Sequence, residues 1–278
     1  MFENREGESV TRMETCSLAA ARRVAAMLDL DPASIAEGDP LPPGWQFILL
    51  GADTRRSDLR GDGFPGLGVP MPDLGLPRLL LGGRTVDYRQ DIPIGSMVER
   101  VSAIKSLTRK TTAQGDMAVV TIAHELHVAT ADKAAIVETQ TYLLLSGKNS
   151  TADSNRVPQA VSAQQSKIVT PDETLLFQYS ALGFNSHKIH IDKAYARDVE
   201  GFPDLVVNGG LVTLLLTEFL RTDLNLIPTG FRTKHLAPLF CGRPITLAAD
   251  RDGNAWRLRA HDDAGKIAAE MEVHTNEL

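Results

Sequence analysis

Cysteine and aromatic residues are scarce in this chain. Its 278 residues include 2 Cys, and Phe, Trp and Tyr together make up 5 % of the sequence. Cys16 and Cys241 lie far apart and fit no spacing of a metal-binding or redox motif, and one possible bridge does not make a disulfide scaffold. The composition therefore excludes a small disulfide-stabilised fold and favours a protein of a reducing compartment.

An excess of positive charge is also absent. The chain has 29 basic and 35 acidic side chains, distributed as 16 against 19 up to residue 150 and 13 against 16 after it. Each part thus carries a net charge of −3, and neither is basic enough for a surface that binds nucleic acid or an anionic membrane.

Long hydrophobic runs are missing as well. No stretch approaches the roughly 20 apolar residues of a transmembrane helix. The N-terminal sequence MFENREGESVTRMETCSLAAARR has acidic residues where a secretory signal needs a positive start, and it lacks an uninterrupted apolar segment. We therefore expect a soluble cytoplasmic protein with no membrane and no nucleic-acid partner.

Hydrophobic residues make up 43 % of the chain, enough for a sizeable core. In the first part, helix-favouring Ala, Leu and Arg with one apolar stripe predict an amphipathic helix over 11–28. Residues 29–77 concentrate Pro and Gly and are expected to form ordered loops. Residues 79–145 are rich in Val, Ile and Thr between turn residues and predict an antiparallel sheet.

The second part begins after a polar stretch, 149–166, that contains Pro158 and is the best linker in the chain. Residues 173–184 are a strand candidate, 208–223 form a predicted apolar helix, and 227–277 contain four further predicted strands with Asp-Gly and Ala-Gly turns.

The two parts resemble one another late in their sequences. Residues 86–101 resemble 233–248, and residues 133–145 resemble 266–278, in the same order. This similarity favours a duplicated unit of about 130 residues.

We therefore predict an α+β fold in which each half is an antiparallel sheet wrapped around a central helix. Residues 1–148 form the first unit, 149–166 the linker and 167–278 the second unit.

The segment 180–216 carries most of the chemistry. It contains Asn185, His187 and His190 after a predicted strand, and Asn208, Gly209 and Gly210 at a helix start. A helix N-terminus presents unpaired, partly positive N–H groups that can stabilise a carbonyl oxygen as it becomes an oxyanion, and glycine allows a close approach. The residues alone predict a histidine-containing site at a helix N-terminus, with surface or capping roles as the alternative.

Within this segment, NSHKIHID resembles the D-x-N-P-x-H-x-D motif of the MaoC-like hydratase/dehydratase branch of the hot-dog superfamily. By this resemblance, Asn185 stands at the catalytic Asp, His190 at the catalytic His and Asp192 at the closing Asp. Gly209 matches the glycine whose N–H binds the thioester carbonyl. The chain departs from the motif because Asn185 replaces a carboxylate, the Pro is absent, and Asn208 replaces a His.

The longer sequence ALGFNSHKIHIDKAYARDVEGFPDLVVNG is similar to the group of 3-hydroxyacyl-thioester dehydratases type 2 and mesaconyl-CoA or itaconyl-CoA hydratases. GDPLPPGWQF, DGFPGLGVP and LPRLLLGGRTVDYRQDIPIG extend the similarity to the first half. The resemblance implies a double hot-dog fold, with a catalytic second unit and a degenerate first unit that completes the acyl and CoA tunnel.

The same resemblance implies the reaction and its partners. We expect reversible addition of water to a 2-enoyl-CoA thioester, on a short branched dicarboxylyl group such as itaconyl or mesaconyl. Coenzyme A enters as part of the substrate, no other cofactor is expected, and the protein is expected to form a homodimer.

Each site residue then has an expected role. His190 is the general base, because an imidazole takes and returns a proton near neutral pH. Asn185 cannot titrate and is expected to orient the water or to hold His190. Gly209, with Asn208 and Gly210 beside it, is expected to bind the carbonyl oxygen at the helix start.

Arg84 and Arg232 are the predicted substrate-binding cations. Either could hold a CoA phosphate or a distal carboxylate, since an unpaired carboxylate in a closed site is costly. His187 is expected to be structural or supporting. No metal site is expected, because no Cys or further His lies near the His187 and His190 pair and the reaction needs no Lewis acid.

Three alternatives stay open at this point. The same fold could dehydrate 3-hydroxyacyl groups on a carrier protein in fatty-acid synthesis, which would need a long apolar tunnel. The missing carboxylate at Asn185 also fits a non-catalytic thioester-binding module. A thioesterase is a further hot-dog possibility, although the order of Asn185, His190 and Gly209 suits water addition better.

Overall fold

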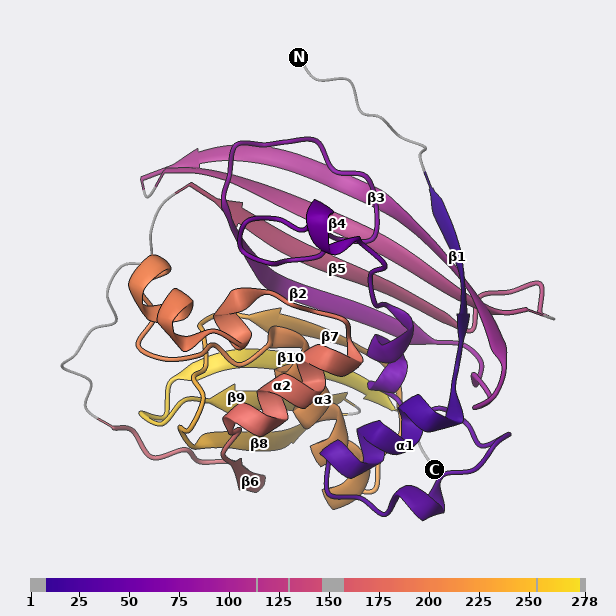
Figure 1. The fold of residues 1–278 in the computed structure, drawn as a ribbon. Coiled ribbons are helices and arrows are strands. Elements are labelled where there is room, and N and C mark those ends of the chain that lie inside the picture. The colour runs from indigo at the N-terminus through magenta and orange to yellow at the C-terminus, as the bar shows by residue number, and fades with distance from the viewer. Residues whose placement is uncertain (1–8, 114, 130, 147–157, 254, 276–278) are drawn as a thin grey trace.

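The computed structural model describes residues 9–113, 115–129, 131–146, 158–253 and 255–275, and in it ten strands form one antiparallel sheet (Figure 1). The first five strands are β1 Val10–Thr15, β2 Arg78–Tyr88, β3 Met97–Thr112, β4 Gly115–Val128 and β5 Ile136–Leu145. The other five are β6 Gln165–Val169, β7 Pro228–His235, β8 Ile245–Asp252, β9 Ala255–His261 and β10 Ile267–Thr275.

The sheet repeats its own strand order about its centre. The order is β1-β3-β4-β5-β2-β7-β10-β9-β8-β6. Read from each outer edge towards the centre, the first half runs β1-β3-β4-β5-β2 and the second β6-β8-β9-β10-β7, so every strand number is raised by five. The halves join where β2 pairs antiparallel with β7, from Gly83 opposite Lys234 to Asp87 opposite Gly230. The similar sequence segments fall on equivalent places, the turns from β2 to β3 and from β7 to β8, and the strands β5 and β10. This arrangement supports the duplication.

The unit boundaries themselves stay a prediction. Half of the predicted linker 149–166, residues 149–157, lies outside the described residues. Its described part is 158–166, in which 158–164 form no helix or strand and β6 begins at Gln165.

Within the part of the chain that the structure describes, three α-helices accompany the sheet: α1 Leu18–Met27, α2 Glu173–Leu182 and α3 Gly209–Glu218. Every side chain from Leu211 to Glu218 is buried, and α3 packs against β9 and β10 in the centre of the second half (Figure 1). A helix that is apolar all round belongs in a core. The fold class predicted from the sequence, an α+β hot-dog architecture, is confirmed.

The first half is covered differently. The prediction of a central helix is wrong for this half: among its described residues the short 3-10 helix Trp45–Leu49, with Trp45 fully buried, and the loop that follows take that place. Phe64 and Leu67 of that loop pack on buried residues of β2, β4 and β5. The Pro- and Gly-rich segment is thus an ordered cover, as expected.

Two predicted elements are wrong. Residues 11–28 are not one helix, because the first part alternates in burial as β1 and the helix α1 begins only after Ser17, whose hydroxyl accepts from the Ala20 N–H at 3.3 Å. Residues 173–184 are helix α2 rather than a strand, and Asp172 caps it by accepting from the Leu175 N–H at 2.8 Å. An Asp at the N-cap indicates a helix, but the Leu and aromatic residues that follow it favour a strand.

Candidate active site

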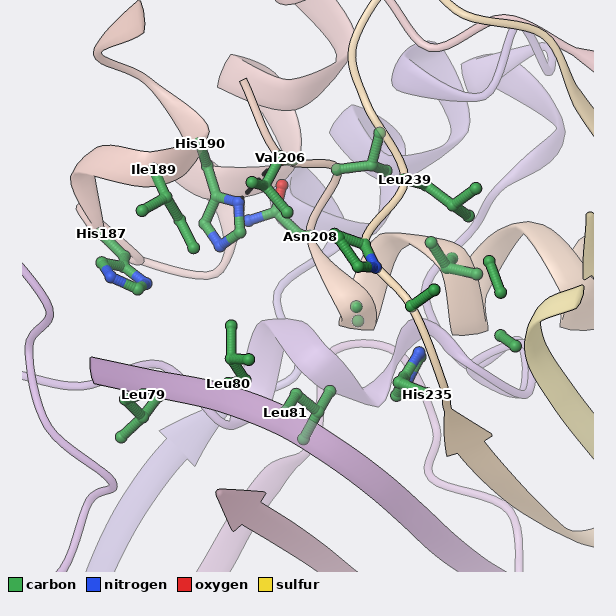
Figure 2. Close-up of a pocket in the computed structure, with 18 of the residues that line it drawn as sticks. Leu79, Leu80, Leu81, His187, Ile189, His190, Val206, Asn208, His235 and Leu239 are labelled. Carbon is green, nitrogen blue, oxygen red and sulfur yellow. Dashed lines mark hydrogen bonds between the residues drawn. The ribbon is translucent and has the colours of Figure 1, made fainter. Parts of the chain in front are cut away.

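A cavity of about 260 Å³ lies between the start of α3, the 185–190 segment and the ends of β2 and β7 (Figure 2). Its lining brings together all but one of the predicted site residues. These are Arg84, Asn185, His190, Asn208, Gly209 and Gly210. Leu80, Leu81, Val206 and Leu239 are among the apolar residues that complete the wall.

His190 ends a short 3-10 turn, Lys188–His190, that follows α2 and not a strand. Its Nδ1 lies 2.7 Å from the carbonyl oxygen of Val206, an acceptor only, so Nδ1 carries the proton (Figure 2). Burial, and to a smaller extent the neighbouring His187, lowers the pKa of His190 from 6.5 to about 3. The imidazole is therefore neutral, with Nε2 as a free acceptor.

The first turn of α3 begins at Gly209, as the sequence predicts. Asn208 does not cap the helix with its side chain. Its Nδ2 instead donates to the Ser180 hydroxyl at 3.3 Å, and its buried Oδ1 has no partner among the described residues. The backbone N–H groups at this helix start therefore keep the open, partly positive character that suits an oxyanion.

Both glycines at this position are in close contact with their neighbours. A Cβ on Gly210 would lie 2.2 Å from the Tyr179 hydroxyl oxygen, and one on Gly209 would lie 3.2 Å from Leu81 Cδ2. A side chain at Gly210 would displace the helix start or the Tyr179 ring, whereas one at Gly209 would need only a small shift of Leu81.

Asn185 lines the same cavity from the loop after α2. It follows Phe184, which has a left-handed backbone with φ of 49°. The Asn185 Oδ1 accepts the backbone N–H of His187 at 3.1 Å. The side-chain carbonyl therefore shapes the turn, and the amide NH2 is the group left to donate into the cavity.

His187 also lines the cavity, although the sequence gave it only a supporting role. It is 4 % exposed, and its ring centre lies 5.4 Å from that of His190. Its Nε2 is 3.7 Å from Oδ2 of Asp62, a residue of the first half. This carboxylate was missed by sequence reasoning, because it comes from a loop far away in the chain.

Arg84 reaches the cavity from β2 and is buried. Its Nε is 3.1 Å from Oε1 of Glu138, a carboxylate that is fully buried and also accepts from Gln46 and Gln140. The ion pair and these hydrogen bonds offset the cost of removing both charges from water.

Arg232 does not line the cavity, so its substrate-binding role stays a prediction. It is exposed on β7, where the buried neighbours Phe231 and Thr233 alternate with it. His235, at the end of this strand, lines the cavity instead. Burial, followed by the nearby Arg84, lowers the pKa of His235 from 6.5 to about 4. The period-two pattern of β7 could have identified it.

A wider hollow of about 820 Å³ adjoins this cavity. Arg78 in its wall pairs with Glu200 at 2.9 Å, and the Arg78 guanidinium carbon lies 5.9 Å from the ring centre of Phe202, which lines the first cavity. The wall also contains Arg60 and Asp62. The hollow and the cavity are thus lined by side chains that lie next to each other, Arg78 in the hollow and Phe202 in the cavity.

Within the described ranges, no group of three or more His, Cys, Asp or Glu side chains is placed to hold a metal ion. No helix among the same residues is long and apolar enough to cross a membrane. Cys16 and Cys241 are both buried free thiols.

The solved structures most useful for comparison share the hot-dog fold. A MaoC-like dehydratase from Phytophthora capsici superposes with a TM-score of 0.70 at 13 % identity, covering 98 % of this chain and 96 % of that one. HtdX of Mycobacterium tuberculosis superposes with a TM-score of 0.69 at 15 % identity, covering 97 % and 100 %. Fold and site together define a MaoC-like double hot-dog protein.

The sequence comparisons give the family. The sequence model of the hydroxyacyl-thioester dehydratase type 2 family matches residues 44–241 of this chain. A mesaconyl-C(4)-CoA hydratase of Chloroflexus aurantiacus is 33 % identical over 258 residues, 91 % of each chain. The mitochondrial hydroxyacyl-thioester dehydratase type 2 of Schizosaccharomyces pombe is 25 % identical over 266 residues, 84 % of this chain and 87 % of that protein. The chain belongs to the hydroxyacyl-thioester dehydratase type 2 family.

Proposed function

We propose that this protein is a hydro-lyase that adds water reversibly to a 2-enoyl-CoA thioester. One observation carries the proposal: a neutral His190, with Nδ1–H held by Val206, shares a cavity with the open N-terminus of α3. A base for water and a site for a developing oxyanion are the two things that this reaction needs.

In the proposed reaction, Nε2 of His190 accepts a proton from water while the water oxygen bonds to the β-carbon of the enoyl group. The electrons of the carbon–carbon double bond move towards the thioester oxygen, which accepts from the N–H groups at the start of α3. The enolate then collapses as its α-carbon takes the proton back from His190. Water is consumed, a hydroxyl and a C–H bond are formed, and His190 returns to its neutral state.

For the acyl group we propose a short dicarboxylyl chain such as itaconyl or mesaconyl. The cavity of about 260 Å³ lies below the ~300–1,000 Å³ common for drug-sized ligands. Its wall contains Arg84 together with Tyr142, Tyr179 and His235. Such a wall suits a small polar end group better than a long fatty chain. The relative that is named as a mesaconyl-C(4)-CoA hydratase supports the same choice.

We propose that the CoA portion of the bound substrate extends through the adjoining hollow, where Arg60 and Arg78 lie beside Asp62 and Glu200. Few basic residues are available for the phosphates there, in keeping with the net charge of −6. The absence of any other cofactor, the homodimer and the cytoplasmic location stay predictions.

A substrate panel tests the proposal. Purified protein is assayed with itaconyl-CoA, mesaconyl-CoA and crotonyl-CoA, and hydration is followed by loss of the enoyl-thioester absorbance. We expect the highest kcat/KM with one of the two dicarboxylyl thioesters. Preference for crotonyl-CoA or longer monoacyl thioesters would overturn the dicarboxylyl choice, and no turnover of any enoyl thioester would overturn the reaction.

The second candidate is dehydration of 3-hydroxyacyl thioesters on a carrier protein, and the dehydratase relative in Schizosaccharomyces pombe favours it. It is the same chemistry in the reverse direction. The two candidates separate when the 3-hydroxyacyl group is presented on CoA and on an acyl-carrier protein, because only a carrier-protein enzyme would prefer the second.

A further inference from the structure

A loop of the first half, residues 61–63, is hydrogen-bonded to residues 186–188 of the second half. The backbone N–H of Lys188 donates to the Asp62 carbonyl at 2.8 Å. The Ser186 hydroxyl donates to the Gly63 carbonyl at 2.7 Å, and Lys188 Nζ donates to the Gly61 carbonyl at 2.8 Å. These bonds place residues 61–63 directly against the 186–188 segment.

Gly63 makes this approach possible. Its φ is +79°, and a Cβ there would lie 2.5 Å from the Ser186 carbonyl oxygen. A side chain would therefore both strain the backbone and push the loop away.

The fastened loop brings the Asp62 carboxylate into the interior. Asp62 is 7 % exposed, and its Oδ1 accepts the Phe64 N–H at 2.9 Å. Arg60 Nη2 lies 3.1 Å from Oδ2, so the carboxylate has a positive neighbour. The same Oδ2 is 3.7 Å from Nε2 of His187.

His187 is a neutral imidazole in this setting. Burial, and then the charge of Arg60, lowers the pKa of His187 from 6.5 to about 4. A neutral imidazole has one N–H donor and one free acceptor nitrogen. The attraction of the Asp62 carboxylate favours the proton on Nε2, which leaves Nδ1 as the acceptor.

The attacking water needs two acceptors if both of its O–H groups are to be held. Nε2 of His190 is one. The carboxylate that the MaoC-like motif has at position 185 is replaced by Asn185, whose Oδ1 already accepts from the His187 N–H. The rings of His187 and His190 lie on the same side of the cavity, across from Leu79 and Leu80 (Figure 2).

We propose that His187, oriented by Asp62 from the first half, is the second acceptor that positions the water beside His190. This rests on the hydration reaction proposed above. The first half then contributes a group that acts on the site through His187, in addition to forming part of the tunnel wall. His187 is a positioning residue, because His190 takes the proton.

The test compares His187→Phe, which keeps a ring and removes the acceptor, with His187→Gln, whose side-chain carbonyl can still accept. A misplaced reactant can cost about 100-fold in rate. We expect kcat of His187→Phe to fall about 100-fold with KM within threefold of the wild type, and His187→Gln to recover at least a tenth of wild-type kcat. His261→Phe is the matched control, since His261 is a buried histidine that does not line the cavity.

A double-mutant cycle tests the link to the first half. Asp62→Asn should lower kcat several-fold in the wild type and should have no further effect in His187→Phe, because the two act through one group. Equal effects of Asp62→Asn in both backgrounds would overturn the orienting role. Melting temperatures show which variants are folded, and His187→Asn, whose amide is shorter, replaces His187→Phe if that variant is unfolded.

The outcomes separate this inference from the function on which it rests. If the wild type hydrates an enoyl thioester and His190→Ala does not, the function holds. A His187→Phe kcat within threefold of the wild type, or His187→Gln no better than His187→Phe, then overturns the inference alone. If the wild type shows no turnover, the proposed function fails first.

Discussion

His190 donates its Nδ1–H to the carbonyl oxygen of Val206 at 2.7 Å. Val206 belongs to the short bridge that pairs with Phe240 directly before the start of α3. One backbone segment therefore fixes the tautomer of the histidine and leads into the helix terminus that would hold the thioester oxygen. The proposed base and the proposed oxyanion site are therefore positioned by the same few residues.

Replacement of His190 tests its role as the general base. General acid–base catalysis is worth ~10²- to 10⁴-fold in rate, so we expect His190→Gln to lose at least 100-fold in kcat while its melting temperature stays close to that of the wild type. Steady-state kinetics on the preferred enoyl-CoA measure the loss. A kcat within threefold of the wild type would show that His190 is not the general base, whereas no activity in the wild type itself would favour a binding module.

The helix start is tested by Gly210→Ala. The added Cβ would overlap the Tyr179 hydroxyl oxygen, so the first turn of α3 or the Tyr179 ring must move, and we expect a loss of about 100-fold in kcat. Gly209→Ala meets the flexible Leu81 side chain at 3.2 Å and should be milder. The double variant Gly210→Ala, Tyr179→Phe should recover part of the rate. Equal activity of Gly210→Ala and the wild type would contradict a close fit at this position.

Arg84 is expected to select the dicarboxylyl substrate. Arg84→Met leaves the buried Glu138 unpaired, which costs about 3–5 kcal/mol of stability, so the informative protein is Arg84→Met, Glu138→Gln. We expect this variant to lose most of its kcat/KM for itaconyl-CoA or mesaconyl-CoA and little for crotonyl-CoA. Arg232→Met is the control, because Arg232 is exposed outside the cavity. Parallel losses on all three thioesters would show that Arg84 has a structural role only.

Stability should fall as the pH is lowered from 7 to 5. Burial is the largest cause that lowers the pKa values of His124, His187 and His235 to about 4 and that of His190 to about 3. In the unfolded chain these groups have a pKa of ~6.5, so below this pH the unfolded state binds protons that the folded state does not. Each such group lowers the free energy of unfolding by up to ~1.4 kcal/mol for every pH unit.

Thermal melts across this pH range measure the effect. His235→Asn removes one of the four groups and should reduce the fall in melting temperature between pH 7 and 5. A melting temperature that does not change over this range, or a slope that is the same in His235→Asn, would contradict the neutral, buried state of these histidines.

The sequence predicts the strands well and the short elements poorly. Strands β2–β5 and β7–β10 alternate or carry β-branched residues between clear turns, so their positions follow from local pattern. The Leu, Phe and Tyr content of α2 favours a strand, although Asp172 is an N-cap. The sequence of β6 lies in a polar stretch and does not indicate a strand. Short elements are decided by contacts that the local sequence does not contain.

The candidate site shows the same division. Asn185, His190 and Gly209 lie close in the chain and carry a motif, and the structure brings them to one cavity. The local sequence at Arg232 does not fix its strand register, which directs the side chain outwards. Asp62 could not be found from sequence, because its contact with His187 depends on how the two halves pack.

The most direct test of water addition is an isotope experiment. The wild-type protein is incubated with itaconyl-CoA or mesaconyl-CoA in ¹⁸O-labelled water, and the products are analysed by mass spectrometry. We predict an intact CoA thioester that has gained one ¹⁸O as a carbon-bound hydroxyl, and formation of this product at least 100-fold more slowly with His190→Gln. Free CoA with ¹⁸O in the released carboxylate would instead show thioester hydrolysis and would contradict the account.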